Sequence, residues 1–193
     1  MTLVSNNRFY WRKARLFEES DGMEDLITDY ITGQKVPNIG AEANRQVVER
    51  YLVEEKGFKK QDIQVNVPIH MQIADQTYRS HVDLVVAIDG RKFITIKCAP
   101  GSLGSREREI VSAARLLDVY PVPLALVSDG KSAILLDAAS GRKIGEGMAA
   151  IPSRNELLNQ FKEVSLEPLT GDRREREKLI FRSYDSMNVN VIR

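Results

Sequence analysis

The sequence predicts an α/β fold in which helices flank a mixed central sheet. The expected elements are, in order, a helix, three strands of antiparallel type, a crossover helix and two further strands. The strand segments alternate apolar and polar residues, whereas the helix segments carry apolar stripes. With 193 residues, 42% of them hydrophobic, the chain can bury one sizeable core but leaves little room for two domains.

We divide the chain into three regions. Residues 1–38 form an extension of helical and irregular structure, residues 39–150 form the core, and residues 151–193 form a C-terminal helical extension. The first region contains the basic and aromatic cluster RFYWRKARLF, a short helix MEDLITDYIT that ends at Gly33, and the linker KVPNIG.

The first long element is a helix over residues 41–56. Its sequence, AEANRQVVERYLVEEK, places apolar residues on one stripe and charges elsewhere, and Gly57 follows as a stop signal. The stripe consists of Val47, Val48, Tyr51 and Leu52. This pattern predicts a helix that packs one face against the sheet.

The core continues with strands and one helix. We expect strands over 62–73, 78–88 and 92–99, a helix over 106–120, and strands over 122–128 and 133–137. The dipeptide Asp89-Gly90 predicts a hairpin turn between the second and third strands. The charged tail GDRREREKLIFRSYD predicts a solvated helix that docks on the body through Leu179, Ile180 and Tyr184.

The strands around Asp89-Gly90 can pair in two registers. A two-residue loop mixes polar and apolar residues on both faces of the sheet. A three-residue loop that begins at Ile88 separates them, with Gly90 in the left-handed conformation of a bulge. We therefore favour the second register, whose opposed pairs are Asp83 with Thr95, Val85 with Phe93, and His81 with Lys97.

The favoured register makes one face of these two strands apolar. That face consists of Val82, Leu84, Val86, Ile88, Ile94, Ile96 and Cys98. We expect it to be buried, with the single cysteine as inert core. The other face gathers Asp83, Thr95 and Lys97 at one end, with His81 beside them. The strand pattern thus predicts a polar corner on an otherwise apolar sheet.

The polar corner has structural explanations as well as chemical ones. Lys97 can extend its stem along the strand to reach water, with Asp83 as its ion-pair partner. His81 is more often a satisfied strand histidine than a general base. Acidic residues near a helix start are favoured by the helix dipole whatever their function. Glu42, Glu107 and Glu109 are such residues.

The motifs around the corner resemble those of the PD-(D/E)XK nuclease superfamily, and more closely those of the N-terminal nuclease domain of type I restriction enzyme R subunits. The helix start GAEANRQ, the strand RSHVDLVV and the strand FITIKCAP match three motifs of that domain in the same order. The segment VPLALVSDGK is similar to the one that ends there in a Thr-Asn-Gly turn. The resemblance covers roughly residues 40–137 and implies a restriction-endonuclease-like fold.

This resemblance implies roles for several residues. Asp83 is implied to hold a divalent ion, Mg²⁺ or Mn²⁺, and Lys97 is implied to be the catalytic lysine. Glu42 is implied as a helical ligand, and Glu49, on a similar face of the same helix, competes with it. The family's glutamate two residues before the lysine is Thr95 here, so the strand lacks one carboxylate.

A carboxylate from the following helix replaces the strand acid in some nucleases of the superfamily. Glu107 and Glu109 are the candidates here, and we take Asp83, Glu42 and Glu107 as the predicted metal ligands. The possible contacts to nucleic acid are Arg45, Gln46, Arg79 and Ser112, the last of which stands where the family has a glutamine.

Two functions are predicted for this fold. The first is a divalent-metal-dependent DNA endonuclease, a hydrolase of a restriction or DNA-processing context. The alternative is a catalytically degenerate module that binds nucleic acid or a protein partner, which can be a second copy of the chain. Arg12, Lys13 and Arg15, or the basic tail, would assist such binding. A third, unrelated interpretation is a structural interaction domain whose polar corner is only an ion pair.

Composition narrows the remaining function classes. The 28 basic and 27 acidic residues give a net charge of +1, which indicates no particular partner. One cysteine and two histidines argue against a disulfide framework and a zinc site. No stretch is long and apolar enough to span a bilayer, so we expect a cytoplasmic protein without membrane contact. We expect no nucleotide cofactor, because SDGKS has Ala125 where a phosphate loop needs glycine.

Overall fold

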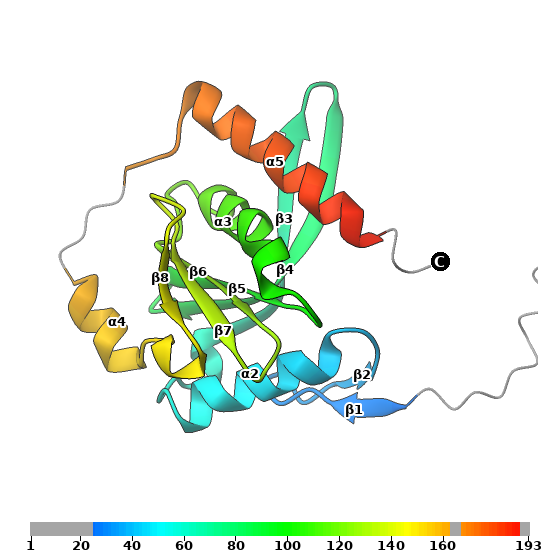
Figure 1. The fold of residues 1–193 in the computed structure, drawn as a ribbon, viewed down its shortest axis with the longest axis vertical. Coiled ribbons are helices and arrows are strands. Elements are labelled where there is room, and N and C mark those ends of the chain that lie inside the picture. The colour runs from blue at the N-terminus through cyan, green and yellow to red at the C-terminus, as the bar shows by residue number, and fades with distance from the viewer. Residues whose placement is uncertain (1–24, 163–166, 190–193) are drawn as a thin grey trace, which may run out of the picture.

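A six-stranded mixed sheet forms the centre of the computed structural model, which describes residues 25–162 and 167–189 (Figure 1). Its strands, in their order across the sheet, are β3 (Ile63–Ile73), β4 (Gln76–Ile88), β5 (Arg91–Cys98), β6 (Leu124–Ser128), β7 (Ala133–Asp137) and β8 (Lys143–Glu146). All neighbouring strands are antiparallel except β5 and β6, which are parallel.

Helices cover both faces of this sheet. They are α2 (Glu42–Glu54), α3 (Glu107–Leu116), α4 (Arg154–Gln160) and α5 (Gly171–Val189), with short 3₁₀ turns at Lys60–Asp62, Leu103–Arg106 and Met148–Ala150. Helix α3 is the crossover that joins the parallel strands β5 and β6. In Figure 1, α3 and α5 lie on one side of the sheet and α2 lies on the other. The predicted α/β fold, a mixed sheet flanked by helices, is confirmed.

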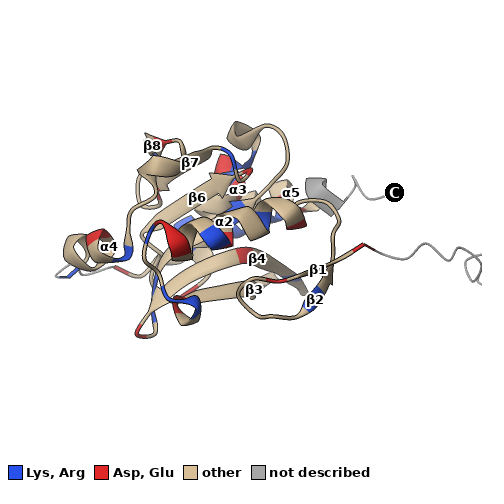
Figure 2. Ribbon diagram, turned by 90° about the horizontal axis from the view of Figure 1, so that it is seen from below, with Lys and Arg blue, Asp and Glu red and all other residues tan. Residues whose placement is uncertain are grey.

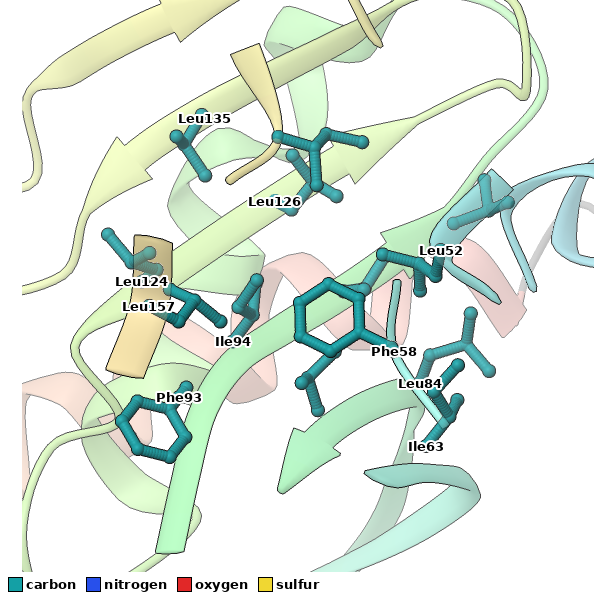
Figure 3. Packing of buried hydrophobic residues seen from close by; sticks show 14 of the residues in the cluster. Leu52, Phe58, Ile63, Leu84, Phe93, Ile94, Leu124, Leu126, Leu135 and Leu157 are labelled. Carbon is teal, nitrogen blue, oxygen red and sulfur yellow. The ribbon is translucent and has the colours of Figure 1, made fainter. Parts of the chain in front are cut away.

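Two apolar clusters fill the space between the helices and the sheet. The first packs α2 and α4 against one face and includes Leu52, Phe58, Leu84, Ile94 and Leu157 (Figure 3). The second packs α3 and α5 against the other face and includes Val85, Ile110, Val127 and Phe181. Cys98 lies in the first cluster, where burial raises the pKa of its thiol well above the ordinary value, as expected of an inert core cysteine.

The elements predicted between residues 41 and 137 are all present, with ends that differ by a few residues. Within α2, Val48 and Leu52 are fully buried as the stripe predicts, whereas Val47 is about half exposed. Strand β8 was not predicted from the sequence, and α4 lies within the predicted helical extension of residues 151–193, although no separate helix was placed there. Helix α4 does carry a readable start signal, since the Ser153 hydroxyl and the Glu156 carboxylate cap each other's backbone N–H groups.

The predicted short helix before Gly33 is wrong for the residues that the structure describes. Residues 25–38 form a hairpin of β1 (Leu26–Thr28) and β2 (Lys35–Pro37). The Asp29 carboxylate accepts the backbone N–H groups of Ile31 and Thr32, so the side chain stabilises a turn instead of a helix. The basic and aromatic cluster RFYWRKARLF lies outside the described residues.

The predicted register of the β4–β5 hairpin is also wrong. The loop has two residues, Asp89 and Gly90, both with positive φ, and Ile88 pairs with Arg91. A bulge then makes Phe93 an extra residue, which places Thr95 opposite Val85 and not opposite Asp83. Phe93 packs its ring 6.1 Å from that of Phe161, a tertiary contact that no strand pattern reveals.

The bulge restores the separation of faces that the two-residue loop alone would destroy. Leu84, Ile94 and Ile96 lie together in the first cluster, as predicted. Val82 is an exception, because it packs in the second cluster with Val85. The predicted apolar face of β5 is therefore present, although the pairing that suggested it is shifted by two residues. Of the predicted polar face of β5, Lys97 keeps some exposure and Thr95 is buried.

Helix α5 docks through residues other than the predicted ones. Of the predicted residues, Leu179 is 55% exposed, and Ile180 and Tyr184 are only half-buried. The buried residues of the helix are Glu177, Phe181 and Asp185, spaced four residues apart. Phe181 meets Tyr78 of β4 edge to face, at a ring distance of 6.4 Å. The buried stripe thus combines one large apolar residue with two acids. Neither α5 nor any other helix of the described residues is long and apolar enough to cross a membrane.

We expect Phe181→Ala to destabilise the whole domain, because the ring fills the core beneath α5. The free energy of unfolding, measured by urea denaturation, should fall by about 3 to 5 kcal/mol. Leu179→Ala, on the exposed side of the same helix, is the matched control and should change it by less than about 0.5 kcal/mol. Equal effects of the two substitutions would show that α5 is not docked as described.

Candidate functional site

Asp83 stands where β4 and β5 separate. The ladder between these strands ends with Leu84 opposite Ile96. Beyond that pair, the Asp83 carboxylate replaces the main chain of β4, since its Oδ2 accepts the backbone N–H of Cys98 at 2.7 Å. The side chain is therefore fixed at the fork of two strands, with its Oδ1 left for other partners.

Lys97 lies between two carboxylates. Its Nζ is 3.5 Å from Oδ1 of Asp83 and 3.3 Å from Oε1 of Glu109 in α3. Burial, which leaves 17% of the Lys97 side chain exposed, acts to lower the lysine pKa. Asp83 and Glu109 outweigh it, so the net pKa of Lys97 is raised and the ammonium keeps its charge.

Glu109 is the carboxylate that α3 brings to Asp83. It is buried in the first turn of the helix, and its second oxygen, Oε2, is 3.5 Å from Nη1 of Arg106. Glu107, two residues earlier, projects from a different side of α3, because successive helical residues turn by about 100°. It lines a separate pocket of about 260 Å³ together with Arg115 and Gly141.

Thr95 lies inside the core, two residues before Lys97 on β5. It is completely buried between Val85 of β4 and Ala125 of β6, and its hydroxyl donates to the carbonyl oxygen of Leu124 at 3.3 Å. The threonine therefore acts as a packed strand residue with an internal hydrogen bond. The shifted register explains why it does not face Asp83.

Glu42 faces Arg45 instead of standing alone. Its Oε1 is 2.5 Å from Nη2 of Arg45 and accepts from Nε2 of Gln46 at 2.8 Å. Glu42 and Asp83 nevertheless line one pocket of about 150 Å³, together with His81. The imidazole is 59% exposed and its Nε2 is 4.0 Å from Oδ1 of Asp83. The structure thus places Glu42 and His81 at the rim of the site.

A buried charge cluster surrounds Arg45 behind that rim. Nη1 of Arg45 is 2.8 Å from Asp29 of the β1–β2 turn and 2.7 Å from Glu49. Gln46 adds contacts to the same turn, since its Oε1 accepts the backbone N–H of Tyr30 at 2.7 Å. Figure 2 shows acidic and basic positions interleaved along α2. The cluster links the β1–β2 hairpin to α2. It was not predicted, because Asp29 was expected in a helix.

Glu49 is the member of the cluster whose carboxylate is incompletely hydrogen-bonded. It is fully buried, and its Oε2 is without a hydrogen-bond partner among the described residues. Burial raises the pKa of Glu49 to about 7, with further contributions from Asp29 and Glu42, while Arg45 acts to lower it. Glu49, which competed with Glu42 as a metal ligand in the sequence analysis, is therefore buried and paired with Arg45.

The predicted nucleic-acid contacts are dispersed. Arg45, Gln46 and Ser112 are buried, and each uses its polar atoms within the chain. Ser112 donates to Oε2 of Glu177 in α5 at 2.8 Å. Arg79 is exposed on β4, opposite His70 of β3. Only Arg79 of these four side chains is open to a nucleic acid.

Asp185 and Tyr78 extend the site, and sequence reasoning missed both. The Tyr78 hydroxyl donates to Oδ2 of Asp185 at 2.6 Å, which brings a carboxylate of α5 to β4. Asp185 also acts electrostatically on Lys97, after the closer Asp83 and Glu109. The four-residue spacing of Glu177, Phe181 and Asp185 could have indicated the buried face of α5. It was missed because two of the three residues are acidic and an apolar stripe was expected.

Two carboxylates, Asp83 and Glu109, are thus the groups that converge on one cation, the Lys97 ammonium. Within residues 25–162 and 167–189, no group of three or more His, Cys, Asp or Glu side chains is arranged to hold a metal ion. Mg²⁺ is commonly held by one or two carboxylates together with water and substrate phosphates. The donor set of Asp83 and Glu109 fits such an ion.

Comparison with protein families gives one finding. The model of the family described as type I restriction enzyme R protein N terminus matches residues 40–152, more than half of the chain. The resemblance found in the sequence motifs is confirmed by this match. Neither the comparison with curated proteins nor the comparison with solved structures gives a match. Helix α5, which supplies Asp185, lies beyond the matched residues.

We expect Glu49→Gln to change the pH dependence of stability. The folded-state pKa of about 7 lies above the ordinary 4.5, so the wild type loses stability as the pH rises through this window. In urea denaturation, its free energy of unfolding should fall relative to the variant by up to roughly 3 kcal/mol between about pH 5 and pH 8. Glu55→Gln, an exposed position just after α2, should leave the pH dependence of the wild type unchanged. Parallel curves for Glu49→Gln and the wild type would contradict this assignment.

Thr95→Glu should destabilise the protein instead of completing a metal site. The introduced carboxylate would be buried beside Val85 and Ala125, so unfolding should become easier by at least about 2 kcal/mol. Thr95→Val keeps the shape and should cost no more than about 1 kcal/mol. Thermal melting with and without Mn²⁺ checks this. A melting temperature of Thr95→Glu that Mn²⁺ restores would mean that position 95 does reach Asp83.

Proposed function

Because the chain belongs to the family of type I restriction enzyme R protein N termini, we propose that this nuclease-like module hydrolyses phosphodiester bonds of DNA with the help of a divalent metal ion. Family membership makes it a restriction-enzyme-related module. The proposed chemistry rests on one observation, which is that Glu109 reaches the cation shared with Asp83. The helix thereby supplies the carboxylate that Thr95 lacks.

Asp83 and Glu109 would hold the ion in this proposal. They come from a strand end and from the first turn of α3, so both are anchored by secondary structure, and Asp83 is further fixed by the N–H of Cys98. When bound, Mg²⁺ or Mn²⁺ supplies Lewis-acid stabilisation of charge on the phosphate and lowers the pKa of bound water. Both carboxylates are substantially buried, which strengthens their attraction for a cation.

Lys97 would act on the substrate. Its ammonium stays charged, sits beside both carboxylates and retains some exposure, so it can orient the attacking water or bind a phosphate oxygen. DNA is the proposed substrate class because the family belongs to restriction enzymes, and partner subunits are proposed on the same ground. Arg79 is the exposed basic residue of β4 that would contact its backbone.

The second candidate is a catalytically degenerate module that binds nucleic acid or a protein partner. It is favoured by the burial of Thr95, Arg45 and Ser112, which removes one ligand position and two substrate contacts from the surface. In that case the Asp83–Lys97–Glu109 contact would be a structural ion-pair network. The two candidates differ in whether the carboxylates bind a metal ion.

Plasmid cleavage in Mg²⁺ or Mn²⁺ tests the choice between them. Glu109→Gln should lower the cleavage rate of the wild type by about 10- to 100-fold or more, because it removes one of two ion ligands. Glu107→Gln is the matched control, since this residue lies in the same helical turn but lines another pocket, and it should retain the wild-type rate. Absence of cleavage by the wild type would favour the degenerate module. Equal cleavage rates for Glu109→Gln and Glu107→Gln would show that Glu109 is not a ligand of the ion.

A further inference from the structure

The Lys97 ammonium takes the position at which the two carboxylates converge. One oxygen of each carboxylate faces Nζ, Oδ1 of Asp83 at 3.5 Å and Oε1 of Glu109 at 3.3 Å. The second oxygens have other donors, the N–H of Cys98 for Asp83 and the guanidinium of Arg106 for Glu109. The oxygens that a metal ion would use are therefore the ones that Lys97 already neutralises.

The surrounding charges favour a cation at this point. Acidic residues of three elements act on the Lys97 ammonium. They are Asp83 of β4, Glu109 of α3 and Asp185 of α5. The basic groups nearby include Lys97 itself, Arg106 beside Glu109, and the exposed imidazole of His81 beside Asp83. Arg45, paired with Glu42, lines the same pocket as Asp83. Without the ammonium, two largely buried carboxylates would face each other with little solvent to screen them.

The contacts to Lys97 are also loose enough to be exchanged. Charge-assisted hydrogen bonds between ammonium and carboxylate are about 2.7 to 2.9 Å long, shorter than the distances found here. A lysine is a point charge on a flexible stem, and 17% of this side chain is exposed. The ammonium can therefore withdraw toward solvent, where a phosphate oxygen would give it a new partner.

We propose that Lys97 is a built-in competitor of the divalent ion, which occupies the shared point of Asp83 and Glu109 until it is drawn to a phosphate of the substrate. The inference rests on the proposed function and adds a form of regulation to it. Metal and phosphate then favour each other, because each takes over one partner of the same ion-pair network. The protein alone binds the metal ion weakly, and the substrate promotes its binding.

Isothermal titration of the metal-free, full-length protein with Mn²⁺ tests this competition. Lys97→Met keeps the length of the stem and removes the charge, so it should bind Mn²⁺ at least about tenfold more tightly than the wild type. Two matched variants control for charge. Arg106→Met removes a cation that is 3.5 Å from Glu109 but does not bridge it to Asp83, and should change the affinity by less than about threefold. Lys92→Met removes another lysine of β5, paired with Asp118, and should leave it unchanged.

Thermal melting guards against misfolding of the Lys97→Met variant. Its melting temperature should lie below that of the wild type in a chelator, because two carboxylates lose their counter-cation, and Mn²⁺ should raise it more than that of the wild type. A variant that is equally destabilised with and without Mn²⁺ would overturn the inference, as would equal affinity for Mn²⁺ in Lys97→Met and the wild type.

The outcomes separate this inference from the proposed function. Tighter binding of Mn²⁺ by Lys97→Met, together with no DNA cleavage by the wild type, would support the competition and reject the nuclease. Cleavage by the wild type with unchanged affinity in the variant would support the nuclease and reject the competition. If Arg106→Met increased the affinity for Mn²⁺ as much as Lys97→Met does, a general effect of charge would explain the result and the competition would be rejected. No binding of Mn²⁺ by any of these proteins would reject both.

Discussion

The hydrogen bond from the Cys98 N–H to Asp83 is the contact on which the site depends. It lies where β4 leaves β5, so a side chain takes over the ladder from the main chain and one carboxylate oxygen is fixed at the fork. The other oxygen of Asp83 then faces the same side as Lys97, one residue before Cys98. Because adjacent residues of a strand point to opposite faces, Cys98 can pack in the core while Lys97 serves the polar corner.

The parallel crossover supplies the second half of the site. After β5 the chain turns into α3, whose first turn lies over the end of the strand that carries Lys97. Glu109 is therefore brought to Asp83 by topology, although the two residues are far apart in the sequence. Helix α5 closes the same face through Phe181 and adds Asp185, so residues beyond the family match contribute to the electrostatics of a site inside it.

Periodicity predicted the elements of the core, because amphipathic stripes and alternating strands reflect which side is buried. It could not predict the bulge at Phe93, a residue whose ring packs against that of Phe161, remote in sequence. The bulge places Thr95 opposite Val85 and not opposite Asp83. The motifs indicated Asp83 and Lys97, and the structure brings these two together. The choice between Glu107 and Glu109 needed the helical phase of α3, that is, which of its residues faces Lys97 in the folded protein.

Asp83 and Glu109 thus form a cation site in which the Lys97 ammonium is the resident cation. The most direct test is a crystal structure of the wild-type protein in complex with a short DNA duplex. The crystals are soaked in Mn²⁺, and the anomalous signal locates the manganese ions. We expect one anomalous peak, from a manganese ion coordinated by both carboxylates, with the Lys97 ammonium moved to a phosphate oxygen. A peak elsewhere, or one that leaves Lys97 between Asp83 and Glu109, would contradict it.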